Sequence, residues 1–219
     1  MLDDWYEIVA CLLPLIVIIG LLGGKWFLLS RRKSQLVSWA SREGLNLDLT
    51  NNEGPNEDYS MFHCLQRGFL RQLQQTSHGK YEGRQVILMQ MKYRTLSLVV
   101  FPWTTKLIQA IIMSSHSPMK PLVVRPRTPS EKASIAVDIE SLSVGPLQFQ
   151  MKYSVLGVSV EAAENVLQPH VIDRLMNVRN VYIEVDLHKA IACQEVGLRC
   201  AEVEELIGIL SSVVSSSER

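Results

Sequence analysis

Histidine and cysteine side chains are the residues most able to bind metals or act as nucleophiles and bases. The chain has five histidines and four cysteines: His63, His78, His116, His170, His188, Cys11, Cys64, Cys193 and Cys200. Their spacing matches neither an H-E-x-x-H zinc site nor a Cys-x-x-Cys redox pair. His63 and Cys64 are adjacent, and adjacent helical side chains diverge by about 100°. The sequence therefore predicts no metal site and thiols that serve as small apolar residues.

Motifs for nucleotide binding and acyl transfer are also missing from the sequence. Lys80 follows Gly79, but Tyr81 stands where a phosphate-binding loop needs Ser or Thr, and the upstream glycine is lacking. No G-x-G-x-x-G and no G-x-S-x-G occurs. The acidic side chains between residues 202 and 205 suit a helix N-terminus better than an acid–base pair. We therefore expect no catalytic residue, no cofactor and no enzymatic activity.

The element that positions the rest is the apolar stretch Ile8–Leu29, which the basic tract Arg31–Lys33 follows. No charge interrupts the stretch before Lys25, and a helix of this length, at about 1.5 Å per residue, spans the roughly 30 Å core of a bilayer. A cleaved signal peptide needs a positive start, but the residues before Ile8 include acidic and no basic side chains. A buried core helix is seldom apolar all round. The stretch predicts a transmembrane helix.

The flanks of this helix predict its direction. Lys and Arg accumulate on the cytoplasmic side of a span, so the basic tract predicts an external N-terminus and a cytoplasmic C-terminal domain at the cell (inner) membrane. The tract also suits attraction to anionic lipid. Aromatic rings and a lysine stem favour the two interfaces. The membrane-interface residues are Trp5, Tyr6, Lys25, Trp26, Arg31, Arg32 and Lys33.

Two weaker patterns suggest binding surfaces. Gly20 and Gly24 form a G-x-x-x-G in the span, which permits close helix approach and hence a homo-oligomer. Lys120, Arg125 and Arg127 lie among prolines and suggest a docking edge, with a solvated loop as the alternative. The formal net charge is zero, so the chain lacks the excess of basic residues that is typical of a nucleic-acid binder. We expect the lipid bilayer and a protein as partners, and no nucleic acid.

Hydrophobic periodicity divides the chain into an anchor, residues 1–33, and one cytoplasmic domain, residues 34–219. Period-two alternation predicts strands at 85–93, 147–153 and 181–186, with a second strand at 96–101 after a turn at Arg94–Thr95. Apolar runs of strand length predict further strands at 107–113 and 122–124, and 190–194 is expected to pair back after a turn at 187–189. In the clearest of them, Leu147, Phe149, Met151 and Tyr153 would share the buried face.

Helical signals lie between and beyond these strands. Periodicity predicts helices at 35–43 and 61–75, and Ser159 and Pro169 mark the starts of two further short helices. Residues 202–214 form an amphipathic pattern in which Val203, Leu206 and Leu210 share a face. The fold class predicted is α+β: one N-terminal transmembrane helix, followed by a mainly antiparallel sheet packed with helices.

Four segments resemble bacterial single-pass membrane proteins that carry a cytoplasmic domain of unknown function. They are LVSWASREGLNL (36–47), GRQVILMQMKY (83–93), LQFQMKYSVLGVSVEAAENVLQPHVIDRL (147–175) and YIEVD (182–186). The resemblance covers most of the chain. It implies no activity and supplies no catalytic residues.

The function we expect is a protein-interaction or scaffold module that holds a partner at the cytoplasmic face of the membrane. The alternative is a membrane-tethered enzyme or small-molecule sensor whose pocket is built from scattered residues. A deep pocket with converging ionisable side chains would favour the alternative, and a flat apolar patch would favour the scaffold.

Overall fold

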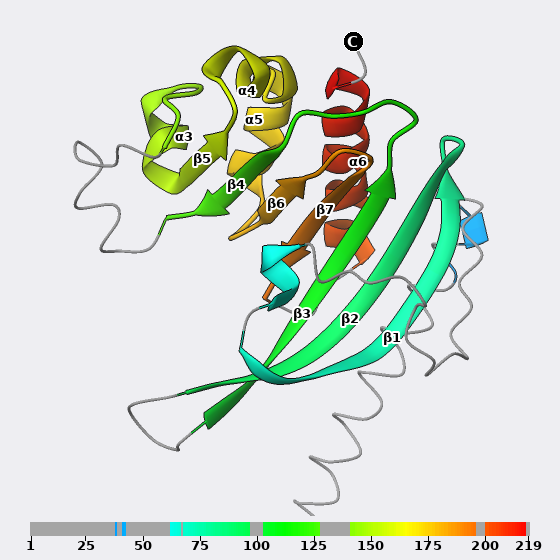
Figure 1. The fold of residues 1–219 in the computed structure, drawn as a ribbon. Coiled ribbons are helices and arrows are strands. Elements are labelled where there is room, and N and C mark those ends of the chain that lie inside the picture. Colours follow the sequence, from blue (N-terminus) through cyan, green and yellow to red (C-terminus); the bar gives the residue numbers. More distant parts are fainter. Residues whose placement is uncertain are drawn as a thin grey trace, which may run out of the picture.

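The computed structural model describes residues 62–66, 68–96, 103–127, 141–195 and 200–217, together with positions 38, 41 and 42. This part of the chain is α+β, with a seven-stranded sheet in the order β1-β2-β3-β7-β6-β4-β5 (Figure 1). The strands are β1 (Phe69–Tyr81), β2 (Arg84–Leu96), β3 (Trp103–Ser114), β4 (Leu122–Pro126), β5 (Tyr153–Gly157), β6 (Tyr182–Val185) and β7 (Lys189–Gln194). The helices are η1 (His63–Gln66), α3 (Leu147–Lys152), α4 (Val160–Val166), α5 (Pro169–Asn177) and α6 (Cys200–Ser217). Every strand pairing is antiparallel, as the alternating patterns predicted.

The first three strands form a long ribbon. Glu82 and Gly83 connect β1 to β2, and both have positive φ, as a two-residue hairpin turn of matching twist requires. Only the second half of β3, from Gln109 to Ser114, pairs with β7. The ribbon therefore continues beyond the rest of the sheet, as Figure 1 shows at its lower left. We call this extension the distal ribbon: residues 69–73 of β1, 91–96 of β2 and 103–108 of β3.

The main core lies between one face of the sheet and the helices α3 to α6. Figure 1 shows α6 running behind β7 and β3, with α4 and α5 beside it on the same face of the sheet, toward β4 and β5. Fully buried side chains from α6, such as Leu206 and Leu210, meet Ile111 of β3 and Ile183 of β6 in one cluster. The amphipathic pattern at 202–214 thus correctly predicted a core helix.

The opposite face of the sheet carries a second, smaller core. Phe62, Cys64 and Leu65, in and next to η1, pack with methionine and isoleucine side chains of β2 and β3. The backbone N–H of His63 donates to Glu184 Oε2 at 2.9 Å, and His63 Nδ1 lies 2.8 Å from Glu184 Oε1. Both faces of the sheet are therefore buried at its centre.

One strand prediction, one helix prediction and one turn prediction were wrong. The segment 147–153, predicted as the clearest strand, is the helix α3 with β5 beginning at Tyr153. Its straight-chain residues suit a helix as well as a strand, and six residues are too few for periodicity to discriminate. Phe149 is buried, while Leu147 and Met151 are 67% and 53% exposed, so the predicted common face does not exist.

The other error concerns the start of the described domain. The predicted helix at 61–75 is a single turn, η1, followed by β1. Gly68 separates the two with a φ of +69°, a conformation that a helix interior does not contain. The predicted turn at Arg94–Thr95 is also wrong, because β2 continues to Leu96.

Helix starts were predicted best. Ser159 accepts a hydrogen bond from the backbone N–H of Ala162 and caps α4, and Pro169 occupies the first turn of α5. Among the residues that the structure describes, no helix combines the length and apolar character that crossing a membrane needs. The predicted span Ile8–Leu29 lies outside the described residues.

Candidate functional site

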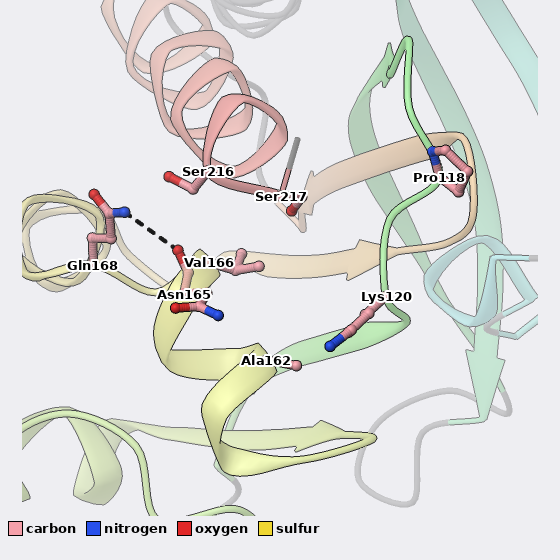
Figure 2. Close-up of a pocket in the computed structure, with 8 residues that line it drawn as sticks. All are labelled: Pro118, Lys120, Ala162, Asn165, Val166, Gln168, Ser216 and Ser217. Atoms are coloured by element: carbon pink, nitrogen blue, oxygen red, sulfur yellow. Dashed lines mark hydrogen bonds between the residues drawn. The ribbon is translucent and has the colours of Figure 1, made fainter. Parts of the chain in front are cut away.

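A pocket of about 540 Å³ opens where three segments far apart in sequence meet (Figure 2). The connection from β3 to β4, the helix α4 with its linker to α5, and the carboxyl end of α6 form its walls. The lining residues are Pro118, Lys120, Ala162, Asn165, Val166, Gln168, Ser216 and Ser217.

Backbone hydrogen bonds hold the β3–β4 connection against the turn between β6 and β7. The N–H of Ser115 donates to the carbonyl of His188 at 2.8 Å, and that of Met119 donates to Leu187 at 2.7 Å. The side chain of Met119 is buried, so the adjacent Lys120 side chain is exposed at the pocket. The position of Lys120 therefore follows from the tertiary contacts of Ser115 and Met119.

The groups that line the pocket suit binding of a polar molecule. Lys120 supplies one cation, and Asn165 and Gln168 supply side-chain amides. The Nε2 of Gln168 donates to the backbone carbonyl of Asn165 at 3.4 Å. Ser217 Oγ donates to the Val213 carbonyl at 2.9 Å, and its oxygen can still accept a hydrogen bond. Lys120 also lies near the carboxyl end of α6, where a cation complements the helix dipole.

Acid–base chemistry finds little support in this lining. None of the eight side chains is His, Cys, Asp or Glu. Within the described ranges, no three such residues gather in a way that could hold a metal ion. Sequence reasoning missed the lining residues Asn165, Gln168, Ser216 and Ser217, because amides and hydroxyls in separate segments carry no local signal.

The structure separates the three residues of the predicted docking edge. Lys120 lies at the pocket, and Arg125 lies within β4. Arg127 is only 8% exposed: its Nε donates to the carbonyls of Gln150 at 2.8 Å and Tyr153 at 3.2 Å, and its Nη2 donates to Ser141. The buried guanidinium of Arg127 therefore connects the end of β4 to α3 by hydrogen bonds, and it is not exposed at an edge.

Replacing Arg127 by alanine should lower the free energy of unfolding by about 2–3 kcal/mol, because it leaves buried carbonyls without a donor. Lys120→Ala is the matched control, since an exposed lysine should change stability by no more than about 0.5 kcal/mol. Urea unfolding followed by circular dichroism measures both. Equal, small effects would show that Arg127 is dispensable for the fold.

A second polar cluster holds the end of α5. Lys152 Nζ donates to the carbonyls of Leu175, Met176 and Val178 at 3.3, 2.8 and 2.9 Å. These are orphan carbonyls at a helix end, where a cation is favourable. The hydroxyl of Tyr153 donates to the carbonyl of Leu175 at 3.1 Å. Lys152 therefore caps the carboxyl end of α5.

Tyr153 gives stability a dependence on alkaline pH. Burial raises the pKa of Tyr153 to about 12 from 10.0, and a hydrogen bond with the Val181 backbone opposes this. Between pH 10 and pH 12 the unfolded chain loses the phenol proton while the folded chain keeps it, so stability falls as pH rises through this window. Urea midpoints should fall less steeply there for Tyr153→Phe than for the wild type. Parallel slopes would contradict this assignment.

The predicted membrane-interface residues, Trp5, Tyr6, Lys25, Trp26 and Arg31–Lys33, lie outside the described residues, and so do Gly20 and Gly24. Their roles remain predictions.

Comparison with known proteins shows the fold and no family. The chain matches no protein-family model, and no curated protein matches its sequence. The fold is similar to that in the crystal structure of the mycobacterial trehalose monomycolate transport factor A, TtfA. The TM-score is 0.50 at 11% sequence identity, over 85% of this chain and 92% of that chain. At this identity, the likeness shows a shared fold alone.

Proposed function

We propose that this chain is a membrane-anchored accessory factor in lipid transport, which binds a protein partner at the cytoplasmic face and catalyses no reaction. The observation that carries the proposal is the likeness to a trehalose monomycolate transport factor over most of both chains. A fold by itself hosts many functions, so this step is an analogy. The site and the anchor supply the remaining support.

The composition of the pocket agrees with binding. One cation, two amides and two hydroxyls line it, beside the apolar Ala162 and Val166. Catalysis needs a nucleophile, a base and an orienting group within hydrogen-bond reach of each other, and apart from Lys120 the lining offers no side chain that commonly acts as a base.

The predicted span explains how a weak binder would act. Tethering confines the domain to the bilayer and raises its effective concentration toward any membrane partner without a new contact. A factor that assists transport of a lipid would gain from this confinement, because both the lipid and the machinery that moves it are in the membrane.

Cross-linking in native membranes tests the proposal. The full chain should yield a reproducible membrane-protein neighbour, identified by mass spectrometry. That neighbour should disappear when residues 62–219 are deleted and persist when residues 8–29 are replaced by an unrelated span. Cells without the chain should accumulate a newly made lipid at its site of synthesis, and the span-replaced chain should restore its transport.

A small-molecule sensor is the second candidate, and the pocket is the observation that favours it. Two results together would support the sensor and contradict the transport factor. The purified full chain would bind a metabolite stoichiometrically, and cross-linking in native membranes would find no protein neighbour that depends on the domain. Lys120→Ala should then weaken binding of the metabolite, while Arg174→Ala, away from the lining, should not.

A further inference from the structure

The balanced net charge of this chain conceals two oppositely charged halves. Between Ser60 and Ser130 the only acidic residue is Glu82, whereas ten residues are basic: Arg67, Arg71, Lys80, Arg84, Lys92, Arg94, Lys106, Lys120, Arg125 and Arg127. After residue 140, carboxylates outnumber Lys and Arg. The ribbon β1–β2–β3 belongs to the basic half, and the helical layer belongs to the acidic half.

Exposed apolar side chains gather at one end of this basic ribbon. Phe69, Leu70, Leu73 and Leu96 are among the large hydrophobic residues that stay exposed, and all four belong to the distal ribbon. Leu70 is 62% and Leu96 is 78% exposed. Exposed apolar groups that cluster in this way mark interaction surfaces more often than single ones do.

The register brings the cations to the same place. Lys92, Arg94 and Leu96 alternate along β2 and therefore point to one face, and Phe69 of β1 lies opposite Arg94. Lys92 is exposed. The distal ribbon therefore presents apolar side chains with basic side chains between them, the composition of groups that bind at a membrane interface.

The backbone at the start of β1 is unusual as well. Leu70 has a φ of +50°, and the pairing of β1 with β2 shifts register between Phe69 and Gln72. A leucine in this conformation is strained by about 1–3 kcal/mol in general, and such outliers concentrate at functional positions. Here the strained bulge holds a largely exposed apolar side chain.

We infer that the distal ribbon is a second membrane contact, which docks the folded domain on a bilayer surface that contains anionic lipid. The cationic side chains match the negative surface of such a leaflet, and Leu70 and Leu96 can enter the boundary between headgroups and acyl chains. In the sequence, β1 is also the first strand after the predicted span. The inference rests on the proposed membrane anchoring and adds an orientation of the domain.

Photo-cross-linking to lipid tests this contact in the full chain. A photoreactive amino acid replaces Leu96 in one protein and Leu187 in another. Leu187 is the matched control, because it is also exposed, at 54%, and lies in the β6–β7 turn at the opposite end of the sheet. Each protein is reconstituted in vesicles of phosphatidylcholine alone or mixed with phosphatidylglycerol, and adducts are identified by mass spectrometry.

The expected result is lipid adducts at position 96 in the mixed vesicles and none above background at position 187. Added salt should weaken the contact, because it screens exposed charges. Lys92→Gln should lower the equilibrium constant for the contact by about fivefold. Lys80→Gln, near the other end of the same strand pair, should leave it unchanged.

Equal lipid adducts at positions 96 and 187, or none at position 96, would overturn the inference. Adducts to protein in place of lipid at position 96 would also overturn it, and would assign the distal ribbon to an acidic protein surface. The comparison of the two probe positions uses the native charges, so it does not depend on whether the lysine variants fold. Loss of this contact with retained transport would leave the proposed function intact.

Discussion

A chain that ends before Cys200 should aggregate and show no cooperative unfolding transition. Seven aliphatic side chains of α6 are fully or nearly fully buried: Val203, Leu206, Ile207, Ile209, Leu210, Val213 and Val214. Burial of one such side chain is worth about 1.5–3 kcal/mol. Even when a compact unfolded state is allowed for, their sum is comparable to the roughly 5–15 kcal/mol by which whole domains are stable. Light scattering and thermal unfolding of the truncated and full chains measure the effect.

A single substitution makes the same test without changing the length of the chain. Leu206→Ala should lower the free energy of unfolding by about 2–5 kcal/mol, because it leaves a cavity in the main core. Glu204→Ala, two residues away on the exposed side of α6, should change it by no more than about 0.5 kcal/mol. If the truncated domain melts as the full chain does, α6 is not part of the core.

Gly68→Ala should destabilise the domain by about 3–5 kcal/mol, through strain at positive φ and overlap with a neighbour. A methyl group at Gly68 would overlap the ring of Tyr93 and the carbonyl of Arg94. The ring has no easy escape, because Tyr93 is buried and its hydroxyl donates to Glu195 Oε1 at 2.9 Å.

Gly83→Ala separates the two contributions. Gly83 also has positive φ, at +80°, but no atom lies within 4 Å of the position that its Cβ would occupy. Its substitution should therefore cost only the backbone strain, about 1–2 kcal/mol. Urea unfolding of both variants, with lipid adducts at position 96 as a second measurement, shows whether the start of β1 also shapes the distal ribbon. Equal losses of stability would mean that the packing of Gly68 on Tyr93 is unimportant.

Much of the fold could be predicted because local physics decides it. Ser159 and Pro169 begin helices by capping and by a preset φ, and both effects involve only neighbouring residues. The strand at 85–93 is long enough for its alternation to exclude a helix. The segment 147–152 is too short for this, and its state depends on Phe149 finding a place in the core.

The candidate site could be predicted only in fragments. Lys120 was noticed for its charge, but the pocket around it joins segments nearly one hundred residues apart. Arg127 has the same charge and a similar setting in the sequence, and it is buried. A side chain's identity does not tell whether tertiary contacts will supply its hydrogen bonds or leave it in solvent.

Sequence alone determined the class of the fold, the antiparallel pairing and the core face of α6, because periodicity reports which side of an element is buried. It also contained the separation of charge between the two halves of the chain. Only the tertiary structure decided that the basic half includes a ribbon extending beyond β7, with Leu70 and Leu96 exposed beside Lys92 and Arg94. The physical reason is register: pairing between distant strands determines which residues lie opposite each other and where the neighbouring strand ends, and no local pattern carries that information.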